Sequence, residues 1–113
     1  MALNYNYISF VKAGRIDGFD KLVKMFMQQS FKRQEVLNEA RFLKTTDTDG
    51  SVDIYLKAMQ KILQDGTGFL AVELERIERL IQGALHPDKA DELQKRKNIL
   101  QQFSILHHEN DEL

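Results

Sequence analysis

Cysteine is missing from this 113-residue chain. Its absence excludes disulfide bonds, thiolate catalysis and zinc sites built on sulfur. Proline occurs once and glycine six times, and because these residues interrupt helices, their scarcity favours an all-α domain. No stretch approaches the roughly 20 consecutive apolar residues of a bilayer-spanning helix, so we predict no insertion into a membrane.

An excess of charge of one sign is missing as well. Sixteen Lys and Arg residues stand against seventeen Asp and Glu residues. This balance gives no electrostatic reason to expect a nucleic acid or an anionic membrane as partner. Hydrophobic residues make up 42% of the chain, which is enough for a core and too much for a disordered chain. At this length we expect a single domain with one core.

A catalytic constellation is the third absence. The chain has three histidines, and two of them are neighbours near the C-terminus. No serine lies in a nucleophile-elbow context, and no glycine-rich phosphate loop follows a strand. We therefore predict that this chain is not an enzyme and that it holds no cofactor and no metal ion.

The sequence does contain five segments in which apolar residues recur at helical spacing. The predicted helices cover approximately residues 17–29, 31–44, 55–63, 69–81 and 88–106. Asp17 and Ser51 are expected to cap the first and the third of them. The predicted fold class is all-α, a five-helix right-folded bundle with a central helical hairpin.

The central hairpin is expected between Tyr55 and Ile81. Apolar residues at helical spacing occur on both sides of a short break at residues 65–68. Two amphipathic helices joined by so short a turn are expected to fold back, each covering the other's apolar face. Gly66 is expected to be the left-handed residue that ends the first arm, and Gly83 is expected to end the second arm in the same way.

Two polar clusters raise the question of a metal site. Asp47, Asp49 and Asp53 lie in a polar loop, but an EF-hand loop needs glycine at its sixth position and glutamate at its twelfth. Counted from Asp47, the glycine is fourth and the twelfth residue is alanine. A calcium-responsive domain stays as the weaker alternative. His107 and His108 cannot face the same side of a helix and lack a third ligand, so we expect a frayed, solvated end there.

Three apolar residues are candidates for binding a protein client: Met25, Met27 and Phe42. Met25 lies off the predicted core stripe of the first helix, Met27 lies at its edge, and Phe42 points away from the core face of the second. Flexible thioethers on a surface suit contact with variable partners, although methionine also fills the edges of cores. A single exposed aromatic residue decides nothing by itself.

The last four residues are Asn110, Asp111, Glu112 and Leu113. They match the endoplasmic-reticulum retention signal Lys/His-Asp-Glu-Leu except at the first position. They predict a location in the endoplasmic reticulum lumen, the retention receptor as a partner, and a flexible tail at residues 107–113 that the receptor can reach. Because the first residues do not form a secretory signal peptide, we expect this chain to be the C-terminal piece of a longer secretory-pathway protein.

Residues in three parts of the chain resemble a known domain family. Around the expected hairpin they are Tyr55-Leu56-Lys57, Met59, Lys61-Ile62-Leu63, Gly66, Phe69, Glu73, Arg76-Ile77 and Arg79-Leu80-Ile81. Near the beginning they are Gly14, Ile16, Phe19 and Asp20, and in the last helix Glu92-Leu93-Gln94-Lys95, Asn98-Ile99-Leu100 and Phe103. Together these residues resemble the C-terminal D domain of endoplasmic-reticulum protein disulfide isomerase-related proteins. The chain departs from that family in the loop at residues 45–50 and at Asn110.

The resemblance implies a domain organisation and a function. Residues 1–13 would be a linker or the tail of a preceding thioredoxin-like domain, residues 14–106 the helical D domain, and residues 107–113 the tail. The implied function is chaperoning or escort of unfolded or secretory client proteins in the lumen, without redox chemistry in this chain. The alternative is a structural module that orients upstream redox-active thioredoxin domains of a protein disulfide isomerase.

Overall fold

The structure is a computed structural model that describes the backbone of residues 17–42 and 50–111 and the side chains of residues 18–42 and 50–107. Within these ranges it contains five α-helices, one short 3-10 helix and no β-strand. They are α2 (Asp17–Gln28), η1 (Ser30–Lys32), α3 (Arg33–Phe42), α4 (Ser51–Asp65), α5 (Phe69–Gln82) and α6 (Pro87–Asp111). The predicted all-α, five-helix fold is confirmed. The predicted linker at residues 1–13 lies outside the described residues.

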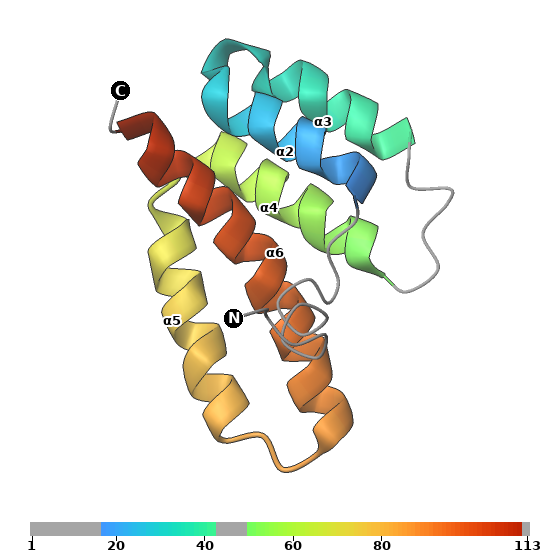
Figure 1. Ribbon diagram of the computed structural model, residues 1–113, viewed down its shortest axis with the longest axis vertical. Coiled ribbons are helices and arrows are strands. Elements are labelled where there is room, and N and C mark those ends of the chain that lie inside the picture. Colours follow the sequence, from blue (N-terminus) through green and yellow to red (C-terminus); the bar gives the residue numbers. More distant parts are fainter. Residues whose placement is uncertain (1–16, 43–49, 112–113) are drawn as a thin grey trace, which may run out of the picture.

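The long helix α6 joins the two parts of the bundle. It packs along α5 and also contacts α2 and α4, while α3 packs on α2 and α4. In Figure 1, α2, α3 and α4 lie together at the top of the view, and α5 lies beside α6 in the lower part. None of the helices in the described ranges is both long and apolar enough to cross a bilayer.

Aromatic side chains from α2, α4 and α6 meet at the centre of the core. The rings of Phe19 and Tyr55 are stacked, with centroids 4.7 Å apart, and Phe26 contacts Phe103 edge to face at 6.1 Å. The Tyr55 and Phe103 rings are 6.4 Å apart. Offset and edge-to-face arrangements of this kind add to the stabilisation that burial of the rings provides. The aromatic cluster therefore holds three helices together.

The helical hairpin is formed by α5 and α6, so the prediction that α4 and α5 would cover each other is wrong. α5 makes extensive contact with α6 and little with α4, and the two helices α4 and α5 are splayed apart in Figure 1. The apolar face of α4 is covered by α3 and α6, with Tyr55 against Phe103. Helical spacing shows which face of a helix is apolar, but it does not show which helix covers that face.

Several helix ends differ from the prediction. The second predicted helix is divided into η1 and α3. Ser51 is the first residue of α4 and is buried, and Gly50, with φ of 81°, takes the capping position. Gly66 has the expected positive φ, also 81°, whereas Gly83 has φ of −95° and is not left-handed. Helix α6 continues past residue 106 to Asp111, because no glycine or proline interrupts the sequence there.

Candidate functional site

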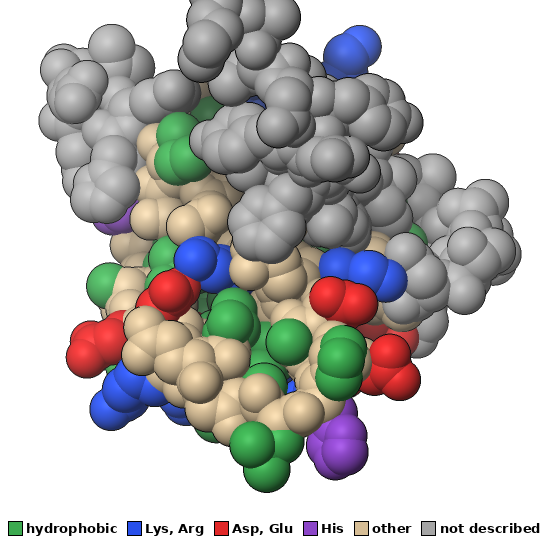
Figure 2. Space-filling view, turned by 60° about the horizontal axis from the view of Figure 1, so that its bottom comes forward, with side chains coloured by type: hydrophobic (Ala, Val, Ile, Leu, Met, Phe, Trp, Pro, Cys, Tyr) green, Lys and Arg blue, Asp and Glu red, His purple; other side chains and the backbone are tan. Residues whose placement is uncertain are grey.

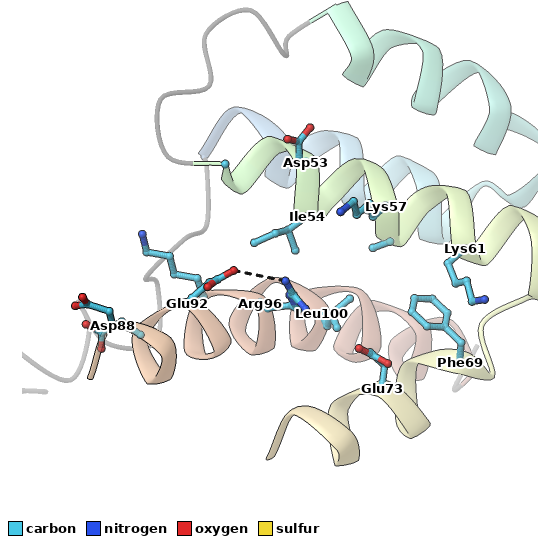
Figure 3. Close-up of a pocket in the computed structure, with 14 residues that line it drawn as sticks. Asp53, Ile54, Lys57, Lys61, Phe69, Glu73, Asp88, Glu92, Arg96 and Leu100 are labelled. Carbon is cyan, nitrogen blue, oxygen red and sulfur yellow. Dashed lines mark ion pairs between the residues drawn. The ribbon is translucent and has the colours of Figure 1, made fainter. Parts of the chain in front are cut away.

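A groove with a volume of about 750 Å³ lies between α4, the beginning of α5 and the first part of α6 (Figure 3). Its apolar lining consists of Ile54, Ala58, Phe69 and Leu100, and the remaining lining is mostly charged, with both signs present. Pockets that bind ligands in proteins have volumes of roughly 300–1,000 Å³ and combine apolar surface with a few polar groups. By size and lining, this groove is the candidate functional site.

Helix α6 supplies one wall of the groove through residues spaced four apart. Asp88, Glu92, Arg96 and Leu100 all line it, and residues at this spacing lie on one face of a helix. The wall therefore changes along its length from acidic at the start of α6, through basic, to apolar. Figure 3 shows the four side chains in this order along the helix.

Helix α4 supplies the opposite wall with the same spacing. Asp53, Lys57 and Lys61 lie four residues apart and line the groove, with Ile54 and Ala58 beside them. In Figure 3 the beginnings of α4 and α6 lie at the same end of the groove. Both walls are therefore acidic at that end and basic further along.

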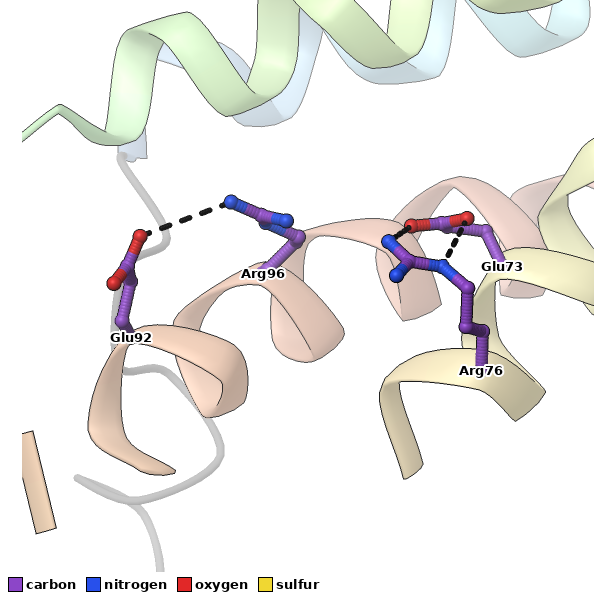
Figure 4. Close-up of polar contacts among 4 residues, drawn as sticks. All are labelled: Glu73, Arg76, Glu92 and Arg96. Atoms are coloured by element: carbon purple, nitrogen blue, oxygen red, sulfur yellow. Dashed lines mark hydrogen bonds and ion pairs between the residues drawn. The ribbon is translucent and has the colours of Figure 1, made fainter. Parts of the chain in front are cut away.

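Among the described residues, four ion pairs involve charged residues of the groove, and one of them joins Lys89 to Glu92 at 3.9 Å. Arg76 donates from Nε to Glu73 Oε2 at 3.1 Å and from its terminal nitrogen to Oε1 at 2.5 Å, and these hydrogen bonds lower the pKa of Glu73 (Figure 4). Lys61 lies 2.7 Å from Asp65, and this hydrogen bond raises the pKa of Lys61. Glu92 is 3.8 Å from Arg96, which is too long for a hydrogen bond.

Three charged residues of the groove are not part of an ion pair in the described part of the chain: Lys57, Asp88 and Asp91. Their charges therefore remain available to a molecule in the groove.

The surface at the α5–α6 connection carries charges of both signs. Figure 2 shows acidic and basic side chains interspersed with apolar ones on this face, with neither sign dominant. This distribution agrees with the formal net charge of −1 for the chain. A nucleic-acid interface requires a continuous basic area, and the described residues on this face do not form one.

The three predicted client-binding residues do not line the groove. Phe42 is 82% exposed at the end of α3, as expected, and Met25 is half-buried against the core. Met27 is only 1% exposed, so it lies in the core and not at the edge of the core stripe, where the sequence placed it. The buried face of α2 is broader than the predicted stripe because it includes Met27 beside Leu22, Val23 and Phe26.

The C-terminal candidates are described only in part. The backbone of Asn110 and Asp111 belongs to α6, while Glu112 and Leu113 lie outside the described residues. His107 is half-buried inside α6, with Nε2 3.5 Å from Thr67 Oγ1, and so does not form the frayed, solvated end that the sequence predicted.

No group of metal-ligating side chains occurs among the described residues. Asp47 and Asp49 lie outside them, and Asp53 lines the groove in the first turn of α4. The calcium alternative therefore stays a prediction.

Sequence reasoning missed the groove and one exposed aromatic residue. Phe31 is 82% exposed in η1, as Phe42 is at the other end of α3. The signal for the groove was present in the four-residue spacing of Asp88, Glu92, Arg96 and Leu100. Mixed charge on a helix usually marks a solvated face, and only the fold places this stripe opposite the matching stripe of α4.

Comparison with known proteins gives consistent matches. The family model described as "Endoplasmic reticulum protein ERp29, C-terminal domain" matches residues 14–103. The chain is 32% identical over 97 residues to "Probable protein disulfide-isomerase A6" of Medicago sativa and 35% identical over 97 residues to "Protein disulfide isomerase-like 2-2" of Oryza sativa subsp. japonica. It is 31% identical over 99 residues to "Protein disulfide-isomerase 1" of Dictyostelium discoideum.

These alignments cover most of the chain and a small part of each relative. Each of the three covers 82% of the chain and 26–27% of the relative, so the chain spans about a quarter of the length of these proteins. No solved structure matches the chain.

Proposed function

Because this chain belongs to the family of the C-terminal domain of endoplasmic reticulum protein ERp29, we propose that it binds unfolded or secretory client proteins as a chaperone or escort. It is a helical domain of protein disulfide isomerase-related proteins. Thiol–disulfide exchange requires a thiolate, and the chain has no cysteine. Redox chemistry would therefore belong to a thioredoxin-like domain elsewhere in the parent protein.

The groove is the observation that carries this proposal. It places four apolar residues, Ile54, Ala58, Phe69 and Leu100, in a concave surface of about 750 Å³. That volume accommodates bulky side chains of an extended peptide. The surrounding charges keep the groove hydrated when it is empty, so binding would be reversible, as a folding assistant requires.

A binding titration with one groove variant tests the proposal. The ligand is a reduced, alkylated secretory protein, which cannot refold, and Ile54→Ser removes a half-buried apolar side chain of the groove. We expect the dissociation constant to rise about fivefold to thirtyfold, because contact with an isoleucine side chain is worth roughly 1–2 kcal/mol. Val72→Ser is the matched control, since Val72 is 69% exposed on α5 and does not line the groove. Equal affinity of Ile54→Ser and the wild type, with helicity retained, would contradict the proposal.

We further propose the lumen of the endoplasmic reticulum as the location and residues 110–113 as the retention signal. The family match names an endoplasmic reticulum protein, and the last four residues match a retention signal at three of its four positions. The retention receptor would be the partner of this segment.

A second candidate function is suggested by two exposed aromatic residues at the two ends of the η1–α3 segment. Phe31 lies in η1 and Phe42 is the last residue of α3, and both are 82% exposed. Exposed aromatic side chains suit a lasting contact with another domain. The domain would then orient a thioredoxin-like domain of the parent. A Phe31→Ser, Phe42→Ser double variant of the parent would make the connection between the domains more sensitive to limited proteolysis, and an unchanged pattern would exclude this role.

A further inference from the structure

The charges of the groove are sorted along its length. On α6 the order is Asp88, Glu92, Arg96 and then the apolar Leu100, and on α4 the order from Asp53 to Lys61 is likewise acidic before basic. Both helices begin at the same end of the groove (Figure 3). The groove therefore has an acidic end and a basic middle. Its far end holds the apolar Leu100 and Phe69 together with Lys61 and Glu73, whose charges are paired with Asp65 and Arg76.

Helix dipoles account for only part of this order. Carboxylates are favoured in the first turn of a helix, which explains Asp53 and Asp88. The dipole acts only within the first and last turns. It does not explain Asp91 and Glu92 further along α6, nor Lys57 in the second turn of α4.

The length of the groove defines the length of a ligand. Asp88 and Leu100 are twelve residues apart, so they are separated by about 18 Å along α6. Asp91 and Leu100 are nine residues apart, or about 13.5 Å. An extended peptide rises about 3.3 Å per residue, so these separations correspond to about four to five peptide residues.

We propose that the groove selects extended peptide segments in which a Lys or Arg lies four or five positions from a bulky apolar residue. The cation would lie among Asp88, Asp91 and Glu92, and the apolar side chain would contact Phe69 and Leu100. Acidic residues of the peptide would be tolerated only in its middle, near Lys57 and Arg96. This inference rests on the proposed client-binding function and names the chemistry of the client segment.

Three labelled peptides test the selection by fluorescence anisotropy. The first carries Lys and Phe five positions apart with serines between them, the second has Glu in place of Lys, and the third has Lys next to Phe. We expect the first to bind about fivefold to tenfold more tightly than either of the others at low salt, with the Lys–Glu difference shrinking as salt is raised. The wild-type chain is used throughout.

Two charge-matched variants locate the effect. Asp88→Asn with Asp91→Asn removes two carboxylates from the acidic end of the groove, and should reduce the Lys–Glu preference to about twofold or less. The control, Glu35→Gln with Glu39→Gln, removes two exposed carboxylates from α3, far from the groove, and should keep the preference. Amide chemical shifts measured with the first peptide should change at the beginnings of α4 and α6 and not on α3.

The outcomes separate the two proposals. If the Lys and Glu peptides bind equally well while Ile54→Ser still weakens binding of an unfolded protein, the charge selection is wrong and the proposed function stands. If the preference survives in the Asp88→Asn, Asp91→Asn variant, the selection does not arise in the groove and the inference is overturned. If neither peptides nor the unfolded protein bind, both proposals fail.

Discussion

At the scale of single residues, Tyr55 connects the apolar centre of the bundle with a chain of polar groups. Its ring is buried against Phe19, and its hydroxyl donates to Gln102 Oε1 at 3.4 Å. Gln102 Nε2 in turn donates to Asp20 Oδ1 at 2.7 Å. A buried amide must find hydrogen-bond partners, so the hydrogen bonds that join Tyr55, Gln102 and Asp20 align α6 with α2 and α4.

Removing the Tyr55 hydroxyl tests how much these hydrogen bonds contribute to the stability of the fold. Tyr55→Phe keeps the stacked ring and leaves Gln102 Oε1 without this donor, so we expect a loss of about 1 kcal/mol in the free energy of unfolding. Urea denaturation followed by circular dichroism measures it. Phe42→Leu, at an exposed position, is the control and should stay within about 0.5 kcal/mol of the wild type. A Tyr55→Phe variant as stable as the wild type would show that the 3.4 Å contact contributes nothing.

Glu73 gives a prediction about pH. Hydrogen bonds from Arg76 lower its pKa in the folded state, so its contribution to stability is complete above the unfolded pKa of about 4.3. It is lost as the pH falls through the lower, folded value. Since the pair is partly exposed, we expect no more than about 0.5 kcal/mol. Subtracting the stability of Glu73→Gln from that of the wild type between pH 7 and pH 2 measures it. Two results would contradict the role given to the Glu73–Arg76 pair. One is a stability difference between the wild type and Glu73→Gln that grows as the pH falls, and the other is the same pH dependence in Glu75→Gln.

At the scale of the elements, helical periodicity predicted the helices well and their partners poorly. Each of the five helices overlaps a segment that apolar spacing predicted, although several of their ends differ, because each must present an apolar face to a core. The pairing of α4 with α5 was wrong because that face carries no information about which helix covers it. Ser51 was misplaced as a cap because serine is a preferred N-cap residue, whereas here Gly50 takes that position and Ser51 begins the helix.

The turn after α4 gives the clearest prediction about an element. Gly66 has φ of 81° and ψ of −178°, a region used almost only by glycine, and a Cβ there would meet no atom within 4 Å. Gly66→Ala should therefore destabilise the fold by about 1–3 kcal/mol through backbone strain alone. Gly68 also has open space around it but has φ of −60°, so Gly68→Ala should change stability by no more than about 0.5 kcal/mol. Thermal unfolding of the two variants compares them. Equal melting temperatures would show that Gly66 leaves its positive φ readily.

At the scale of the whole molecule, the groove could not be predicted because its walls come from three separate helices. The charge order of Asp88, Glu92 and Arg96 can be read in the sequence, but a solvated helix face gives the same order. The groove exists because α4 and α6 begin at the same end and α5 places Phe69 between them. The positions of single side chains were predicted unevenly. Phe42 points away from the core, as its spacing predicted, whereas Met27 was placed at the edge of the core stripe and is fully buried.

The C-terminal segment connects the fold with the proposed location of the protein. Helix α6 includes Asn110 and Asp111, so half of the proposed retention signal has helical backbone. Consecutive residues of a helix point in different directions, so a receptor that read Asn110 and Asp111 together with the residues after them would need the end of α6 to unwind. The acidic residues Glu109 and Asp111 are unfavourable at the C-terminal end of a helix dipole, which lowers the cost of unwinding.

Secretion of the chain from cells tests the signal. Expressed behind a secretory signal peptide, the chain should stay largely inside the cell, and deletion of residues 110–113 should move most of it into the medium. Asn110→Lys restores the cation of the common signal and should reduce any residual secretion. Asn38→Lys, at an exposed position on α3, adds the same charge elsewhere and should leave secretion unchanged. If the truncated chain is retained as well as the intact one, residues 110–113 are not the signal, and retention must arise from binding by the helical domain itself.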